Sequence, residues 1–210
     1  MIIDSHAHLD YPPLSNDIHS VLMRARANKV DNVITIGVKL SNASAPKQIA
    51  ERFNNVWCTV GVHPHEAGNE LHASDNGAFL READHPKCVA IGEAGLDYFY
   101  NHATPEQQEA SFRTQISVAR ELDLPIVIHS RDADDRMAAI LKDEMEKGTF
   151  RGVMHCFSSG FELAKQALNL GLFISFSGIL TFKKSDQIQK IASMVPEDRL
   201  LVETDAPYLA

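Results

Sequence analysis

Histidines and carboxylates follow closely on several short apolar runs of this sequence. Six residues share that position: His6, His8, Glu93, His129, His155 and Asp205. Imidazole nitrogens and carboxylate oxygens are the side-chain atoms that catalytic sites use to bind divalent metal ions. If the apolar runs are parallel strands, their carboxyl ends lie side by side, which is where barrels and open sheets bind ligands. The six residues therefore predict a metal site, and their number suggests two ions.

The strongest local signal is the pair His6 and His8, with one residue between them. Residues two positions apart in a strand point to the same face, so both imidazoles can reach one ion. Taken alone, such a pair is explained equally well by two surface histidines that are close by chance. The other ligand candidates at strand ends favour the metal site.

Glu93 lies between two glycines in the segment 92–97. A carboxylate in this position can bridge two metals, because its two oxygens can serve separate ions. The alternative is a glutamate that caps a helix or forms an ion pair. Asp97, at the end of the same segment, either orients a metal ligand from outside the metal's own shell or caps a loop.

Asp205 and Glu203 follow the last apolar run. We expect Asp205, nearer the mouth, to bind one metal and to accept a proton from the metal-activated water. Glu203 lies one layer deeper, where it is better placed to hold a ligand histidine by its second ring nitrogen.

Three further residues are predicted to contact the substrate: His63, His65 and Arg131. His63 and His65 suit oxyanions or leaving groups, although either of them can instead be a ligand. The planar guanidinium of Arg131 matches the oxygens of a phosphate. An ion pair with Asp132 or Asp134 is the alternative for Arg131.

Apolar, β-branched runs that can position these residues recur about every 30 residues, close to one βα unit. They lie near residues 2–5, 33–38, 56–62, 88–92, 126–128, 152–155, 173–177 and 200–204. The runs are apolar on both faces, as is typical of parallel strands covered by helices.

Helical patterns fill the gaps between these runs. Thr104-Pro105-Glu106-Gln107 combines an N-cap, a proline at the first helical position and the glutamine of a capping box. Eight strands and seven intervening helices predict an α/β fold, a (β/α)₈ TIM barrel, as one metal-dependent hydrolase domain over residues 1–210. The barrel is expected to lack the C-terminal covering helix, because only six residues follow Thr204.

Composition narrows the class of protein. The apolar content of 44% is ordinary for a globular domain, and three cysteines argue against a disulfide framework. No signal peptide or membrane-spanning run is present, so we expect a cytoplasmic protein with no membrane contact and no stable protein partner. The net charge of −8 argues against broad adhesion to nucleic acid, but two bound divalent cations would make the site locally positive.

Seven motifs appear in order over nearly the whole chain: DSHAHLD (4–10), GVHPH (61–65), GEAGLDY (92–98), HSRDA (129–133), HCFSSG (155–160), FSGILTF (176–182) and ETDAPYL (203–209). With them the sequence resembles the TatD family of metal-dependent hydrolases, within the wider amidohydrolase-like barrels. The resemblance implies a TIM barrel whose divalent-metal site is built from the six strand-end residues. It also implies deoxyribonuclease activity, typically 3′→5′ exonuclease action on DNA. Members of the family usually continue well past the ETDAPYL motif.

From the residues and the resemblance together we predict hydrolysis of a phosphodiester bond by metal-activated water, with Glu93 bridging and Asp205 moving the proton. The imidazole-rich ligand set suits zinc, manganese or iron better than magnesium, whereas the family's nuclease activity is usually described as magnesium-dependent. One alternative is an amidohydrolase-like enzyme that cleaves a small-molecule amide or ester. Many binuclear barrels of that kind carry a carboxylated lysine where this chain has Glu93. A second alternative is a truncated, inactive barrel that acts as a binding protein.

Overall fold

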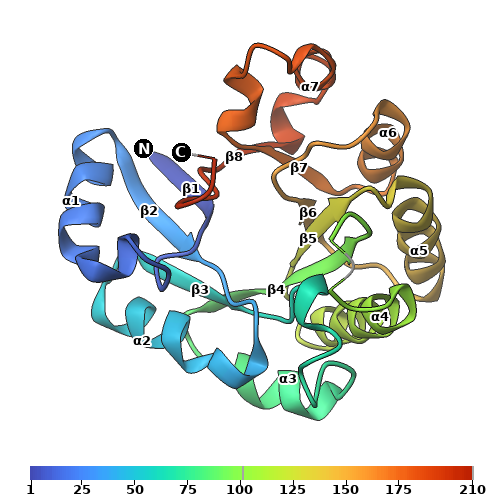
Figure 1. Cartoon of the computed structure of the whole chain (residues 1–210), viewed down its shortest axis with the longest axis horizontal. Coiled ribbons are helices and arrows are strands. Elements are labelled where there is room, and N and C mark those ends of the chain that lie inside the picture. Colours follow the sequence, from blue (N-terminus) through green and yellow to red (C-terminus); the bar gives the residue numbers. More distant parts are fainter. Residues whose placement is uncertain (101, 210) are drawn as a thin grey trace.

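Eight parallel strands alternate with helices around one axis in the computed structural model, which describes residues 1–100 and 102–209 (Figure 1). The strands are β1 (Ile2–Ala7), β2 (Val30–Thr35), β3 (Val56–Val60), β4 (Cys88–Asp97), β5 (Ile126–Arg131), β6 (Gly152–Met154), β7 (Phe173–Phe176) and β8 (Leu200–Val202). The helices are α1 (Ile18–Ala27), α2 (Ser44–Arg52), α3 (Asn76–Ala83), α4 (Pro105–Glu121), α5 (Asp134–Lys147), α6 (Phe161–Asn169) and α7 (Asp186–Ala192). Short 3₁₀ helices are η1 (Leu14–Asn16), η2 (Leu40–Asn42), η3 (Pro64–Glu66), η4 (Gly178–Thr181) and η5 (Glu197–Arg199).

The strands follow one another in chain order around the sheet, from β1 to β8. β1 and β8 form no ladder among the described residues. One parallel bridge between Ala7 and Ala206, and a hydrogen bond from the hydroxyl of Ser5 to the carbonyl of Val202 at 3.0 Å, join the two edges. The barrel is therefore nearly closed, and the predicted α/β TIM-barrel fold is confirmed. Within the described residues no helix follows β8, and the side chains of Ile3 and Val202 beside the gap are each 47% exposed.

The helices pack their apolar faces on the outside of the barrel (Figure 1). α4 begins with the predicted capping box, in which Thr104 and Gln107 each bond the other's backbone N–H. Its Phe112 and Ile116 are fully buried against the strands. None of the helices in residues 1–100 and 102–209 is long and apolar enough to cross a membrane.

Three strands extend beyond the ends that the apolar pattern predicts: β1 by two residues to Ala7, and the neighbouring strands β4 and β5. β4 continues past residue 92 to Asp97, and β5 continues past residue 128 to Arg131, with the two strands paired to their ends. Gly95 permits this pairing, because a Cβ there would lie 2.0 Å from the carbonyl oxygen of His129. Glu93 and His129 consequently lie within strands rather than in loops.

Candidate metal centre and active site

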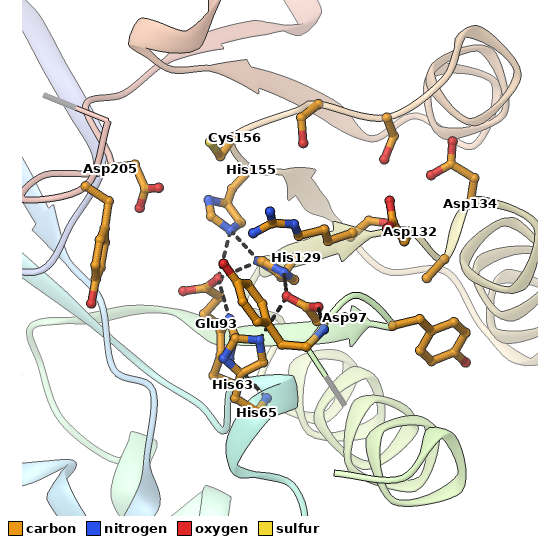
Figure 2. A pocket seen from close by; sticks show the side chains of 18 of the residues that line it. His63, His65, Glu93, Asp97, His129, Asp132, Asp134, His155, Cys156 and Asp205 are labelled. Carbon is orange, nitrogen blue, oxygen red and sulfur yellow. Dashed lines mark hydrogen bonds and ion pairs between the residues drawn. The ribbon is translucent and has the colours of Figure 1, made fainter. Parts of the chain in front are cut away.

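The six residues predicted as metal ligands meet at the mouth of the barrel, around the buried carboxylate of Glu93. They come from β1, β4, β5 and the segments that follow β1, β6 and β8. Figure 2 shows Glu93, His129 and His155 joined by contacts in the pocket, with Asp205 on a neighbouring wall. The pocket has a volume of about 1320 Å³.

The two oxygens of Glu93 face different groups of histidines. Oε2 lies 3.4 Å from Nε2 of His6 and 3.9 Å from Nε2 of His8. Oε1 lies 2.8 Å from Nε2 of His155 and 3.0 Å from Nδ1 of His129. One carboxylate thus separates two sets of ligand atoms, as a residue that bridges two cations must.

The set on the Oε2 side includes Asp205. Nε2 of His6 and Nε2 of His8 lie only 3.3 Å apart, and Oδ1 of Asp205 is 3.6 and 3.5 Å from them. Nδ1 of both histidines is buried without a hydrogen-bond partner in the described part of the chain. Two buried imidazoles that turn their nitrogens toward carboxylates at such close range fit a shared cation.

The histidines on the Oε1 side each turn their second nitrogen to another carboxylate. Nε2 of His129 lies 3.1 Å from Oδ2 of Asp97, and Nδ1 of His155 lies 3.3 Å from Oε1 of Glu203. Such partners fix the tautomer and orientation of an imidazole that binds a metal, so that the nitrogen facing Glu93 would be the one to give up its hydrogen to a cation. This set also fits a divalent cation.

Charge in the free site is concentrated on the pair His155 and Glu93. Burial opposes ionisation of Glu93, yet its pKa lies well below the usual range because His155 and the other imidazoles stabilise the carboxylate. Burial likewise opposes the charge on His155, but Glu93 and Glu203 raise its pKa well above 6.5. Without a metal, His155 is therefore an imidazolium between two carboxylates.

Asp205 is ionised in the free site. Burial favours its neutral form, but a hydrogen bond from His8 and the charges of His155 and His6 lower the pKa of Asp205 below 3.8. A carboxylate in this state can bind a cation or accept a proton.

His63 occupies the N-cap of η3 and points its ring at the same site. Its Nδ1 accepts the backbone N–H of His65 at 3.1 Å, so the hydrogen of the neutral ring sits on Nε2, 3.3 Å from Oε1 of Glu93. Burial lowers the pKa of His63 to about 4, which keeps the ring neutral near pH 7. By distance alone His63, Glu93 and His129 also form a group able to hold a metal. The hydrogen on Nε2 favours a donor at this position over a ligand.

Asp97 contacts both His129 and the loop beyond β4, the two kinds of contact that its sequence position suggests. Oδ2 lies 2.9 Å from Nε2 of His65 as well as 3.1 Å from His129. Oδ1 accepts the backbone N–H groups of Phe99 and Tyr100, each at 3.1 Å.

Arg131 stands at the rim without a carboxylate partner among the described residues. The alternative ion pair with Asp132 or Asp134 does not form, since Asp134 instead accepts the N–H of Gly160. The guanidinium of Arg131 lies over the rings of Phe99 and Tyr100, residues that the sequence pattern did not single out. The feature of the sequence that could have pointed to Phe99 and Tyr100 is their position directly after the strand that carries Glu93.

Comparisons with known proteins agree with this geometry. A family model described as "TatD related DNase" matches residues 3–210. The "Uncharacterized metal-dependent hydrolase YcfH" of Escherichia coli (strain K12) is 40% identical over 212 residues, which cover 100% of this chain and 78% of that protein. The "3'-5' ssDNA/RNA exonuclease TatD" of Klebsiella pneumoniae is 37% identical, with 99% of this chain and 79% of the relative covered.

Solved structures show the same likeness. The crystal structure of YjjV, a TatD homolog from Escherichia coli K12, superposes with a TM-score of 0.87 at 29% identity. The superposition covers 99% of this chain and 80% of the YjjV chain.

Proposed function

The chain belongs to the TatD-related DNase family, and on that premise we propose that it is a divalent-metal-dependent nuclease that hydrolyses phosphodiester bonds, as a 3′→5′ exonuclease on single-stranded DNA. The observation that carries the proposal is the division of ligand atoms between the two oxygens of Glu93. Two cations held side by side are the arrangement that phosphodiester hydrolysis uses in many nucleases.

The residues proposed to hold the metals fall into two sets that share Glu93. His6, His8 and Asp205 form the first set, and His129 and His155 form the second. When bound, divalent ions supply the Lewis acidity that polarises a phosphodiester and makes water nucleophilic near neutral pH. The imidazole-rich donors favour zinc or manganese over magnesium.

The chain's own groups then have separate tasks in the proposed reaction. Asp205, ionised and at the mouth, accepts the proton of the attacking water. His63 donates its Nε2–H to an oxygen of the phosphate, a role that its neutral tautomer allows throughout the physiological range. His65 and the guanidinium of Arg131 hold the phosphate from the rim, where no carboxylate of residues 1–100 and 102–209 pairs with Arg131.

Asp97 and Glu203 are proposed to act through the ligands rather than on the substrate. Asp97 holds His129 and Glu203 holds His155, each at the nitrogen turned away from Glu93. Loss of such a partner typically lowers metal affinity by about 10–100-fold.

A substrate screen with defined metal content tests the proposal. The chain is stripped with a chelator, reloaded separately with Mg²⁺, Mn²⁺ or Zn²⁺, and assayed on a 5′-labelled single-stranded oligonucleotide, a p-nitrophenyl phosphodiester and a dipeptide-like amide. We expect metal-dependent cleavage of both phosphodiesters, with shortening of the oligonucleotide from its 3′ end. Cleavage of the amide without cleavage of either phosphodiester would instead identify an amidohydrolase.

A further inference from the structure

Four aromatic side chains that are not among the proposed metal ligands stand around the mouth of the barrel in two pairs. The first pair is Phe99 and Tyr100, and the second is Tyr11 and Tyr208. We propose that these two pairs stack against unpaired bases on either side of the bond to be cleaved, and so select single strands over duplexes. The inference rests on the proposed nuclease function and adds to it the residues that distinguish single strands from duplexes.

The guanidinium of Arg131 lies against the first pair. The ring centroids of Phe99 and Tyr100 lie 4.7 Å apart at 85°, and the two residues are 53% and 46% exposed. The guanidinium of Arg131 lies 4.2 Å from the first ring centroid and 4.7 Å from the second. Stacking on rings leaves the N–H groups at the edge of the guanidinium free for a phosphate. This corner therefore offers a base platform beside a phosphate donor.

The second pair adjoins the first set of metal ligands. The rings of Tyr11 and Tyr208 lie 6.4 Å apart at 83°, and both also contact the ring of His8, at 5.3 and 5.6 Å. Tyr208 is 51% exposed. A base that stacks on this pair lies next to the ligands of the first set.

The order of the strands places the two pairs on opposite sides of the mouth. Phe99 and Tyr100 follow β4 and Arg131 ends β5, whereas Tyr11 follows β1 and Tyr208 follows β8. In an eight-stranded barrel with strands in chain order, β1 lies across from β5 and β4 lies across from β8. Tyr11, Tyr100, Arg131 and Tyr208 all line the same cavity as Glu93. A strand with its phosphate at Glu93 therefore meets aromatic rings on both sides.

The first pair is also fixed relative to the metal ligands. Oδ1 of Asp97 holds the backbone of Phe99 and Tyr100, while Oδ2 of the same carboxylate contacts His129. A single side chain thus sets the spacing between the base platform and the reacting phosphate.

Aromatic stacking discriminates by strandedness rather than by base identity. Every base has a π-face, so stacking tolerates any sequence, but in a duplex both faces of each internal base are already covered. The rings of Tyr11, Tyr100 and Tyr208, which all line one cavity, consequently accept a single strand or a frayed end.

Leucine substitutions test the inference, because leucine keeps apolar bulk but has no π-face. Phe99→Leu/Tyr100→Leu and Tyr208→Leu are each expected to lower kcat/KM on a single-stranded oligonucleotide by about tenfold, the effect of one lost base stack. The loss on methyl p-nitrophenyl phosphate, which has no base, is expected to be much smaller. Tyr100→Phe, which keeps the ring, is expected to retain the preference for the single strand over a blunt duplex of the same sequence.

Arg199→Ala is a control that breaks a cation–ring contact away from the mouth. Arg199 lies 5.1 Å from the ring of Phe173 at the other end of the barrel, so its removal should leave both substrates unaffected. A parallel fall on both substrates in the leucine variants, or no fall at all, would overturn the inference while the nuclease function stands. A parent protein that cleaves neither substrate would overturn the nuclease function and the inference with it.

Discussion

At the scale of single residues, Asp205 and Asp132 offer a test of the proton acceptor. Both line the cavity and both have positive φ, +58° and +51°, which asparagine tolerates well. Asp205→Asn should retain most of the metal, because an amide oxygen can still bind it, and should lose about 10²–10⁴-fold in kcat, because an amide cannot accept the proton. Metal analysis and steady-state kinetics check both expectations.

Asp132→Asn is the control for that variant. It makes the same chemical change in the same cavity, at a carboxylate that contacts none of the proposed ligands within the described residues. Parent-like turnover in Asp205→Asn would remove Asp205 from the role of proton acceptor.

Substitutions of His63 test whether its ring donates a hydrogen bond to the substrate or binds a metal. Because its Nδ1 already accepts the N–H of His65, we expect His63→Ala to keep its metal content and to lose about 10²-fold in kcat, as when a donor to a developing charge is removed. His63→Gln, which restores an N–H group, should recover part of the loss. Loss of metal in proportion to activity would make His63 a ligand instead.

The charge state of His155 gives the site a pH dependence. Its pKa in the free protein is raised well above 6.5, so at pH 7 both ring nitrogens carry hydrogens, and a ligand must give one up. Metal binding at pH 7 should therefore release a proton, and the apparent affinity should rise with pH until the pH exceeds the raised pKa. Calorimetry of metal binding in phosphate and Tris buffers measures this release. A binding enthalpy that does not depend on the buffer would contradict the assigned charge state.

At the scale of elements, Gly95 in β4 sets the distance between two ligand-bearing strands. A side chain there meets both a φ of +143° and the carbonyl of His129, whereas Gly171, with φ +81°, has open space around it. Gly171→Ala should cost about 1–3 kcal/mol from backbone strain alone. Gly95→Ala should cost more and should also lower metal content, because β4 must move away from His129.

Thermal unfolding checks the comparison of the two glycines. Each kcal/mol lowers the Tm of a chain of this size by about 2–4 °C. Equal Tm losses with full metal content in both variants would show that the contact with His129 is unimportant.

The same two strands show what the sequence could and could not predict. The apolar runs predicted the order of all eight strands and the ends at which His129 and Glu93 stand. They placed the ends of β4 and β5 too early, because glycines and polar residues interrupt the apolar pattern where the strands enter the site. Apolar periodicity indicates which residues are buried in the core. The residues at these strand ends are polar and pack against one another, so the pattern does not detect them.

The contacts between side chains could not be predicted from the sequence, for a related reason. The contact of Arg131 with Phe99 joins the end of β5 to the loop after β4, and the tautomer of His63 depends on one backbone N–H in a turn. Neither leaves a periodic signal. The pairing of Asp97 with His129 was one of two possibilities from sequence, and the structure contains both at once.

At the scale of the whole molecule, the site depends on how the barrel closes. Asp4 in β1 accepts hydrogen bonds from the backbone N–H and the hydroxyl of Thr204, at 2.9 and 2.7 Å. The N–H of Asp205 donates to the carbonyl of His6 at 2.9 Å. These bonds hold Asp205, which follows β8, close to His6 and His8, although β1 and β8 form no continuous ladder. The first set of ligands is thus assembled only in the folded barrel.

The net charge of −8 makes a local positive site necessary for a nucleic-acid substrate. The most direct test is therefore a titration of chelator-stripped protein with Mn²⁺, in which cleavage of a single-stranded oligonucleotide is followed against equivalents of metal per chain. Glu93 shared by two ligand sets predicts no cleavage without metal and a rise that levels off at two equivalents. Cleavage by the metal-free protein, or no cleavage at any metal content, would contradict a metal-dependent nuclease.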